Sequence, residues 1–414
     1  MKQVKIGQVF STIRNGATIQ QDKVVDGIPI TRIETIADGT VDMNRLGYAS
    51  VQGENFKDFY LEEGDILMSH INSVSHLGKV AIFENRNEKI IHGMNLLCLK
   101  TYPDKLLPKY AFYYLKSLQF RSSIKKITKK SVNQASFNIS NLKEIDIPLP
   151  SLSTQIQIAN ILSKAETLIE QRKQSIALLD EFLKSTFLKM FGDPTSNKKK
   201  YPKAKIRDVV TEVKYGTSKP AEEEGKYPYL RMNNITTDGY WDLSKLKYIN
   251  MGDDEKAKCV VRKGDLLFNR TNSKELVGKT AVFNLDEEMI IAGYLIRLRF
   301  KENINPYFVW GYLNSLHGKQ TLLGMCKSIV GMANINAQEL QDLKIIIPPI
   351  KLQTQFAAIV TKTEALKEQY KKSLQELENL YGSLSQQAFK GALTFKEEEE
   401  APLMMAAEPD VKYN

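Results

Sequence analysis

Two long stretches of the chain carry the hydrophobic repeat of a packed α-helix. The first runs from residue 151 to residue 190 without a proline or a glycine, and its apolar residues recur every seven positions. The repeat consists of Leu162, Ile169, Ile176, Leu183 and Met190. Such spacing predicts a helix that packs along a neighbouring helix. The pattern ends at Gly192-Asp193-Pro194, where glycine and proline favour helix termination.

The second stretch, from residue 351 to residue 390, repeats this pattern with Phe356, Tyr370, Leu377 and Leu384 in one row. The chain alternates globular segment, helix, globular segment, helix. This order allows the two helices to pack against each other antiparallel with one globular segment at each end, and we expect that arrangement. Both helices carry more apolar width than one partner helix covers, so further helices are predicted to dock on them. The residues predicted to bind such a partner are Ile161, Leu168, Phe182, Phe187, Leu374 and Tyr381.

Residues 201–350 repeat residues 1–150 at an offset of 200. Leu61 to Leu67 matches Val261 to Leu267 around a shared Gly-Asp, and Asn72-Ser73 matches Asn272-Ser273. At the same offset Ile147-Pro148 matches Ile347-Pro348, and Thr154-Gln155 matches Thr354-Gln355. A fixed internal period of this kind predicts two copies of one fold.

Each copy mixes short β-type runs with turns, and the first contains an aromatic-rich helix expected from about Lys109 to Ile127. The sequence therefore predicts an α+β fold with two similar globular domains separated by two long antiparallel helices, related by a pseudo-two-fold internal repeat. The expected segments are a first globular domain at 1–150, a helix at 151–192, a second globular domain at 193–350, a helix at 351–391, and an acidic flexible tail at 392–414.

Charge and cysteine content narrow the functional classes. The formal net charge is +10, which fits a polyanionic partner but also a generic basic soluble protein. The 3 cysteines show no paired spacing, so neither a disulfide framework nor a metal site is expected, and a reducing cytoplasm is the predicted location. No run of residues is apolar enough for a membrane span, so no membrane association is expected.

Catalytic motifs were sought and fail. Gly278-Lys279-Thr280 resembles the end of a phosphate-binding loop, but the first glycine of that motif is replaced by Ser273, so a turn into a strand is predicted. Asn305-Pro306-Tyr307-Phe308 lacks the second proline of the adenine-methylation motif and is expected to start a helix. No active site is assigned.

Polar loop sequences follow the Gly-Asp strand in both copies. Ser69 to Ser73 in the first copy corresponds to Asn269 to Ser273 in the second, where Lys274 follows. Asparagine and arginine suit hydrogen bonding to base edges, and lysines suit phosphate contacts, although these segments are equally compatible with ordinary surface turns. If both loops contact DNA, His70 opposite Arg270 predicts different base preferences. The candidate DNA contacts are Ser69, His70, Asn72, Ser73, Lys79, Lys129, Lys130, Asn133, Gln134, Asn269, Arg270, Asn272, Ser273, Lys274 and Lys327.

The whole plan resembles the specificity subunit of a type I restriction-modification system. The resemblance covers residues 1 to about 392 and rests on the duplicated plan and on motifs at the helix ends. These motifs are Ile147-Pro148-Leu149-Pro150, Ile347-Pro348-Pro349-Ile350, Phe187 to Pro194, and Gln387 to Gly391.

The resemblance implies that each globular domain is a target recognition domain for one half of a bipartite, asymmetric site in double-stranded DNA. It also implies that the helices dock two methyltransferase (modification) subunits, and through them restriction (motor-nuclease) subunits. S-adenosylmethionine would be bound by the methyltransferase subunits and no cofactor by this chain. The alternatives are a free-standing sequence-specific DNA-binding regulator and, less well supported by the motifs, a fused restriction or modification enzyme.

Overall fold

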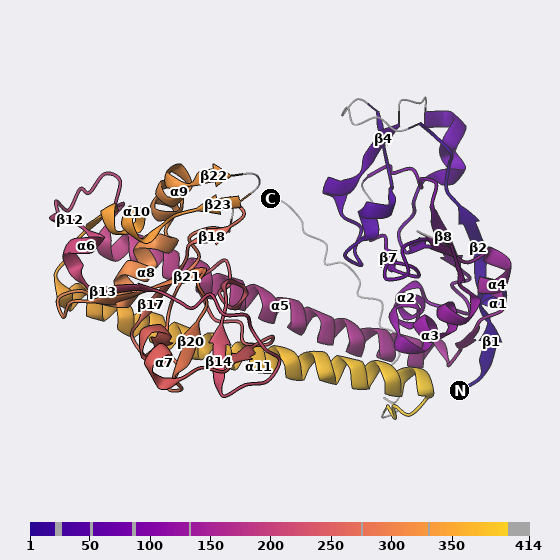
Figure 1. Cartoon of the computed structure of the whole chain (residues 1–414). Helices are drawn as coiled ribbons and strands as arrows, with labels where there is room; N and C mark the ends of the chain where they lie inside the picture. Colours follow the sequence, from indigo (N-terminus) through magenta and orange to yellow (C-terminus); the bar gives the residue numbers. More distant parts are fainter. Residues whose placement is uncertain are drawn as a thin grey trace, which may run out of the picture. The chain divides into compact units, whose positions relative to one another are not determined.

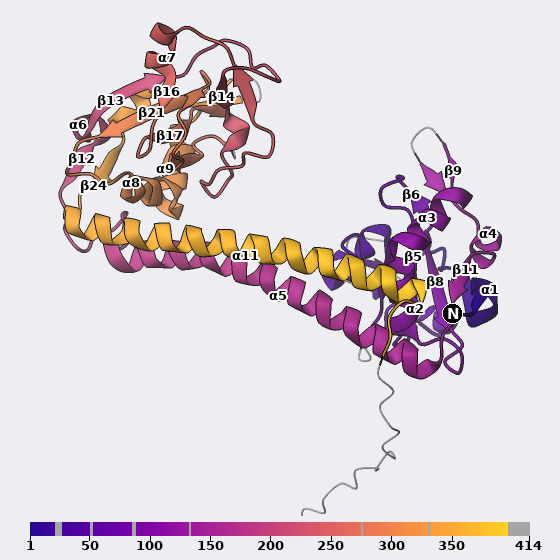
Figure 2. The same ribbon diagram turned by 90° about the horizontal axis from the view of Figure 1, so that it is seen from below.

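A computed structural model of the chain shows two compact units (Figures 1 and 2). The structure describes residues 1–20, 27–49, 53–84, 88–131, 134–274, 276–329 and 332–395. Unit 1 comprises Met1–Gln171 and Leu374–Asn414, and unit 2 comprises Arg172–Ser373. The acidic segment that was predicted to be a flexible tail lies outside the described residues from position 396 on.

Unit 1 is built on a four-stranded antiparallel sheet of order β2-β8-β5-β7. These strands are β2 (Phe10–Asn15), β8 (Leu96–Thr101), β5 (Ile66–Ser69) and β7 (Val80–Ile82). One face of the sheet packs with helices α2 (Pro108–Lys116) and α3 (Leu118–Ile127) in the main core, and the other face contributes to a smaller apolar cluster. Unit 1 also contains β1 (Gln3–Lys5), which pairs with β11 (Asp146–Pro148), the pair β3 (Ile28–Ile30) and β4 (Gly47–Ala49), and helices α1 (Ile6–Val9) and α4 (Ile139–Lys143).

Unit 2 repeats this plan. Its sheet has the order β13-β21-β17-β19 and consists of β13 (Val210–Tyr215), β21 (Leu295–Phe300), β17 (Leu266–Asn269) and β19 (Thr280–Val282). The helices are α6 (Ile206–Val209), α7 (Asp253–Cys259), α8 (Pro306–Asn314), α9 (Leu316–Met325) and α10 (Ala337–Asp342). A second sheet contains β15 (Lys247–Ile249), β14 (Tyr227–Leu230), β20 (Met289–Ile291) and β16 (Val260–Val261), and β12 (Lys203–Lys205) pairs with β24 (Lys344–Ile346). The predicted α+β class and the internal repeat are confirmed.

The aromatic segment of unit 1 corrects one prediction. A single helix was expected from Lys109 to Ile127, but the chain forms α2 and α3 with a break at Ser117. Ser117 takes an extended conformation, and its hydroxyl accepts a hydrogen bond from the Phe120 amide, so it caps α3. Unit 2 breaks in the same way at Ser315, whose hydroxyl accepts from the Gly318 amide.

The repeat also drifts in register, so the constant offset of 200 is wrong for its second part. Ser69 pairs with Leu96, whereas Asn269 pairs with Leu295, so the long strands are 199 residues apart. Val4 pairs with Ile147, and Ala204 pairs with Ile345, an offset of 198. Connections between elements tolerate one-residue deletions more easily than strands do, and the two deletions fall there. Gln155 therefore corresponds to Gln353, and Ile147 corresponds to Ile345.

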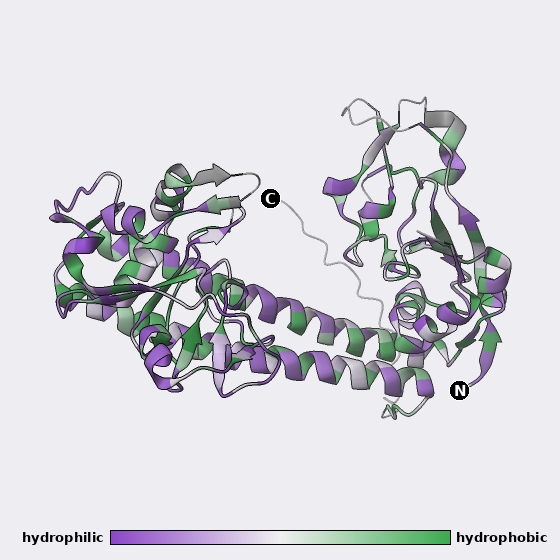
Figure 3. Ribbon diagram, in the orientation of Figure 1, coloured by the Kyte–Doolittle hydropathy of each residue, from purple (hydrophilic) through white to green (hydrophobic). Residues whose placement is uncertain are grey.

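The two predicted long helices are present as α5 (Leu152–Phe191) and α11 (Ile350–Lys390), and each contributes to both units. In unit 1, the start of α5 packs with the end of α11, through Ile158 and Phe389 in one core. In unit 2, the end of α5 packs with the start of α11, through Phe187 and Phe356. Within each unit the helical segments are therefore antiparallel. Figure 3 shows hydrophobic residues interspersed with hydrophilic ones along both helices.

One buried glutamine fixes the start of each long helix. The Gln155 side chain accepts a hydrogen bond from the Leu107 amide and donates to the carbonyls of Lys105 and Pro150. Gln353 does the same in unit 2, accepting from the Asn305 amide and donating to the Pro348 carbonyl. Because a buried amide is costly unless all its hydrogen bonds are made, these glutamines tie each helix to the loop that precedes α2 or α8.

Candidate nucleic-acid interface

A small three-stranded sheet in unit 1 joins the two segments of predicted DNA contacts. Its strands are β6 (Ile71–Asn72), β10 (Ala135–Ser136) and β9 (Lys129–Lys130), in the order β6-β10-β9. Ala135 pairs with both Asn72 and Lys130, so the loop after β5 lies beside a basic segment about sixty residues later in the chain. The side chains of Ser73, Lys129, Lys130 and Gln134 are exposed, and that of Asn72 is half-buried. Asn133, also predicted to contact DNA, lies outside the described residues.

Unit 2 forms the equivalent sheet from β18 (Thr271–Asn272), β23 (Met332–Asn334) and β22 (Lys327–Ile329). Asn272 pairs with Ala333, and Lys327 pairs with Asn334, so the two predicted segments again lie side by side (Figure 1). Lys274 is exposed, and Asn272 and Ser273 are half-buried. Lys327 begins β22, but the described part of the chain does not include its side chain.

The loop between the strands has the same geometry in both units. The Gly78 amide donates to the Ser69 carbonyl, and the Gly278 amide donates to the Asn269 carbonyl, which closes each loop at its base. Gly78 and Gly278 have φ angles of 72° and 82°, a region that favours glycine. The prediction of a turn leading into a strand at Gly278-Lys279 is therefore confirmed, because β19 begins at Thr280.

Burial corrects three of the predicted DNA contacts. Ser69, His70 and Asn269 are all buried in the interior of their units. The His70 ring lies against Phe137, and burial lowers the pKa of its imidazole. Asn269 accepts a hydrogen bond from the Thr271 amide within its own loop. These side chains shape the loops and offer no accessible edge to a base.

Lys79, also predicted to contact DNA, is half-buried, and its ammonium group binds the backbone of unit 1. It donates to the Ala37 carbonyl at 2.6 Å and thereby fastens a neighbouring turn. The equivalent Lys279 donates to the carbonyls of Met232 and Ile235. Burial lowers the pKa of Lys279. Both lysines thus hold a neighbouring turn of the backbone in place.

Arg270 lies at the junction of the main sheet and the small sheet of unit 2. Its amide donates to the Tyr294 carbonyl, and its carbonyl accepts from the Ile335 amide. The guanidinium carbon lies 4.9 Å from the centre of the Tyr215 ring, and the Tyr215 hydroxyl accepts from the Ala337 amide. Stacking on an aromatic ring positions the guanidinium while leaving hydrogen-bond donors for a ligand.

The sequence analysis missed Tyr215 and Tyr294, both of which are substantially exposed beside Arg270. Tyr215 is the last residue of β13, and Tyr294 lies between Gly293 and the first residue of β21. Neither position differs in the sequence from an ordinary strand end, so only the fold places them together. Aromatic side chains next to a cation are suited to contacts with nucleic-acid sugars and bases.

The predicted partner-binding residues divide into exposed and buried groups. Leu168 is 50% exposed on the unit 1 part of α5, and Phe182 is 49% exposed on its unit 2 part. Phe187 is a correction, because it is only 2% exposed and packs with Phe308 and Phe356 in the core of unit 2. Ile161 and Tyr381 pack partly against the core of unit 1, and Leu374 is half-buried. Exposed leucines of α5 and α11 that the sequence analysis did not select are Leu152, Leu178, Leu188 and Leu380.

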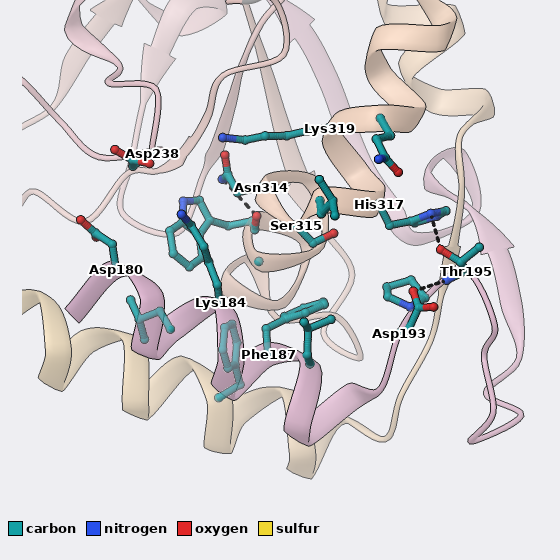
Figure 4. Close-up of a pocket in the computed structure, with 18 of the residues that line it drawn as sticks. Asp180, Lys184, Phe187, Asp193, Thr195, Asp238, Asn314, Ser315, His317 and Lys319 are labelled. Atoms are coloured by element: carbon teal, nitrogen blue, oxygen red, sulfur yellow. Dashed lines mark hydrogen bonds between the residues drawn. The ribbon is translucent and has the colours of Figure 1, made fainter. Parts of the chain in front are cut away.

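A hollow of about 460 Å³ lies in unit 2 between the end of α5 and the start of α9. Its walls include Leu183, Trp310 and the strongly exposed Leu316. Figure 4 shows Asp180 and Asp238 on one side of this hollow, and Thr195 and His317 on the other. The Thr195 hydroxyl lies 3.0 Å from Nδ1 of His317. The hollow adds apolar surface next to the exposed face of α5.

Two negative findings apply to the described part of the chain. No helix there is both long and apolar enough to cross a membrane. No group of three or more histidine, cysteine, aspartate or glutamate side chains among those residues is arranged to hold a metal ion.

Comparison with known proteins gives a consistent result. The family model described as the type I restriction modification DNA specificity domain matches residues 1–179 and again residues 198–379. A putative type I restriction enzyme MjaX specificity subunit from Methanocaldococcus jannaschii is 33% identical, over 90% of this chain and 89% of its own length. The type I restriction enzyme EcoKI specificity subunit of Escherichia coli is 22% identical, over 96% of this chain and 90% of its own length.

Solved structures agree with this assignment at the level of the fold. The S subunit of a type I restriction-modification system from M. genitalium aligns with a TM-score of 0.57 at 16% identity, covering 94% of this chain and 96% of that one. A chain from a study of complex assembly and conformational transition of the type I R-M system aligns with a TM-score of 0.53 at 18% identity, covering 95% of this chain and 98% of that one. The chain belongs to the DNA specificity subunits of type I restriction-modification systems, which are non-catalytic components with two target recognition domains.

Proposed function

We propose that the chain reads a bipartite, asymmetric site in double-stranded DNA, with unit 1 on one half and unit 2 on the other. The observation that carries the proposal is the small three-stranded sheet that occurs once in each unit. In both copies it places a strand that ends in asparagine beside a second segment that contains lysine. Amide and guanidinium groups read base edges, and lysines bind phosphates, so each sheet combines readout with backbone attachment.

The differences between the two sheets support an asymmetric site. Unit 2 presents Arg270 stacked on Tyr215, whereas the corresponding His70 in unit 1 is buried against Phe137. Arginine pairs with guanine through two hydrogen bonds, and a buried histidine makes no base contact. The two units therefore carry different readout chemistry on the same backbone.

We further propose that the exposed side of the long helices docks two methyltransferase subunits. Leu168 in unit 1 and Phe182 in unit 2 are large apolar side chains that are half exposed on α5. Exposed apolar surface next to polar residues is typical of protein interfaces, and aromatic side chains contribute strongly to binding. S-adenosylmethionine would be bound by the methyltransferase subunits, and restriction subunits would join through them.

The proposal is tested by producing the chain together with the methyltransferase subunits of its host and mapping methylated bases in the genomic DNA. We expect one chain to purify with two methyltransferase copies, and the methylated motif to consist of two short halves around an unread spacer of fixed length. A single continuous motif would contradict bipartite reading. A chain that binds specific DNA but purifies without a methyltransferase would instead be a free-standing regulator.

A further inference from the structure

A second feature of unit 2 lies next to the small sheet but is not part of it. It is a hollow of about 440 Å³ between the turn at Thr237, the loop that carries Lys274, and helix α9. Lys319 and Gln320 of α9 line one side, and Leu322 and Leu323 line its apolar part. Because Lys274 directly follows Ser273, the hollow begins where the proposed DNA-reading loop ends.

The described residues that line this hollow include three lysines and no acidic residue. Lys274 and Lys319 are exposed. The Lys319 ammonium donates to the Thr237 carbonyl at 3.1 Å, and Figure 4 shows the side chain extended with its ammonium group away from His317. Lys279 is committed to backbone carbonyls, so its remaining contribution is a fixed positive charge behind the hollow. An anion placed here would meet two accessible ammonium groups.

Unit 1 has a hollow in the equivalent place, of about 310 Å³, lined by the turn at Ala37 and by Lys79, Lys116 and Arg121. Its net positive charge is lower, because Asp38 also lines it and Lys116 is paired with Glu166. Arg121, which corresponds to Lys319, is its exposed cation. The same hollow thus occurs in both units, and the residues that line it carry a higher net positive charge in unit 2.

We propose that each hollow holds a phosphodiester of the DNA backbone beside the half-site that its unit reads, with Lys274 and Lys319 binding it in unit 2 and Arg121 binding it in unit 1. This inference rests on the proposed DNA-reading function. A mixture of ammonium groups and apolar side chains matches the chemistry of the backbone, in which charged phosphates alternate with deoxyribose. The adjacency of Lys274 to the reading loop favours DNA over a free phosphate or nucleotide.

The salt dependence of binding is the quantity that such contacts control. Each phosphate contact that is lost lowers the slope of log K against log salt concentration by about 0.9, and it weakens all sequences alike. The Lys274→Gln and Lys319→Gln variants of the full chain, assembled with methyltransferase subunits, should each lower the slope by about 0.9. Arg121→Gln should do the same. The double variant in unit 2 should also lower it by no more than about 0.9, because both lysines bind the same phosphate.

Lys263→Gln is the matched control. Lys263 is an exposed lysine of unit 2 that pairs with Asp286, and it lies at the opposite end of β17 from the reading loop. Its loss changes the net charge by the same amount but should leave the slope unchanged. Duplexes with single neutral methylphosphonates then locate the contact. The wild-type complex should be weakened at one linkage in the unit 2 half-site, and the Lys274→Gln/Lys319→Gln complex should be insensitive at that linkage.

The outcomes separate this inference from the proposed function. If neither unit 2 variant changes the slope and the complex still selects its motif, the proposed phosphate contact is wrong and the DNA-reading function is unaffected. A change in preference at one base without a change in slope would also overturn the phosphate contact. An effect seen when phosphate replaces chloride at equal ionic strength, but not with methylphosphonates, would assign the hollow to free anions. A wild-type complex without sequence preference would instead contradict the proposed function.

Discussion

The main sheets of the two units share their strand order and register but not their buried charges. In unit 1, Cys98 pairs with Leu67 at the centre of the sheet, and in unit 2 Arg297 pairs with Leu267 at the equivalent place. Arg297 is only 1% exposed, and its guanidinium donates to Glu212 and to the Val260 carbonyl.

The residues next to Arg297 and Cys98 differ between the units in the same way, with more charged groups in unit 2. Arg299 of unit 2 bonds to both Glu212 and Asp265, whereas Lys100 of unit 1 is paired with Glu62 at 2.7 Å and with Asp65 at 3.4 Å. Where unit 2 has Glu212, unit 1 has Thr12. Burial raises the pKa of Asp65, which has the weaker cationic partner of the two equivalent aspartates. The comparison shows that the backbone frame depends on the apolar pattern, while the polar content can be exchanged as a set.

The long helices show a second exchange of this kind. Glu166 of unit 1 accepts hydrogen bonds from Lys116 and from the Tyr113 hydroxyl. Glu364, 198 residues later, accepts a hydrogen bond from the Asn284 side chain, and burial raises the pKa of Glu364 to about 7. Nearby Lys367 interacts with Asp180 and stacks over the Tyr240 ring. One copy of the position is thus an ion pair and the other an incompletely compensated acid.

The largest effect is expected where the two units dock their partners. Leu168→Asp and Phe182→Asp each place a charge on an exposed face of α5, so neither should unfold the chain. An unpaired charge buried in an interface costs about 3–5 kcal/mol, which predicts the loss of one methyltransferase copy in each variant. Native mass spectrometry gives the stoichiometry directly. Two copies retained by both variants would show that this face is not the interface.

The next effect concerns the buried charge set of unit 2. Glu212→Ala removes the carboxylate that is hydrogen-bonded to the buried Arg297 and leaves Asp265 at 3.9 Å, so we expect a loss of about 3 kcal/mol in the free energy of unfolding of unit 2. The matched variant in unit 1, Thr12→Ala, should cost less than about 1 kcal/mol. Denaturant unfolding of both variants measures the difference. Equal losses would mean that the Arg297 set adds no more stability than its neutral counterpart.

A smaller effect is expected in base readout. Arg270→Ala should relax one position of the unit 2 half-site by about 1–3 kcal/mol of discrimination, because a bidentate contact to a base is lost. His70→Ala removes a buried side chain and should lower stability without changing the unit 1 half-site. Binding to single-base variants of the cognate duplex distinguishes the two. Uniform weakening across all duplexes would make Arg270 a phosphate contact.

The smallest effect depends on pH. The pKa of Glu364 is about 7 in the folded chain, whereas its ordinary value is 4.5. Between these two pH values the folded chain retains a proton on Glu364 that the unfolded chain has lost. Its contribution to stability is complete below pH 4.5 and is lost as the pH rises to about 7. At pH 8, Glu364→Gln should therefore stabilise unit 2 by about 1–2 kcal/mol, allowing for partial exposure. Glu166→Gln should destabilise unit 1, because it breaks the pair with Lys116. If both variants changed the free energy of unfolding at pH 8 in the same direction, the different roles of Glu166 and Glu364 would be contradicted.

The repeat and both long helices could be predicted because they are periodic. Seven-residue rows such as Leu162 to Met190 specify a helix wherever they occur, and the shared Gly-Asp turn before β5 and β17 fixes the register of the first half of each unit. The break at Ser117 was missed because serine is tolerated inside a helical pattern, and its capping role depends on the conformation of one residue. The drift from 200 to 198 was missed because similar motifs remain nearby at both offsets.

The site was predicted only in outline. The polar loops and the lysines of β9 were selected by residue type, and the fold brings them together in one sheet. Burial of Ser69, His70 and Asn269 could not be seen in the sequence, since they follow an apolar strand by a single residue or belong to its end. Phe187 was assigned to the partner face because a helical stripe does not tell which of its residues face the chain's own core. That distinction requires the packing of α5 against α8 and α11.

The central claim is that each unit reads one half of a bipartite site independently of the other. It is tested most directly by exchanging residues 1–150 for the same region of a relative and mapping the methylated motif in the host genome. Because the main sheet, the small sheet and the hollow lined by Arg121 in unit 1 all lie within that segment, we expect one half of the motif to change while the other half keeps its sequence. A motif altered in both halves would contradict independent reading.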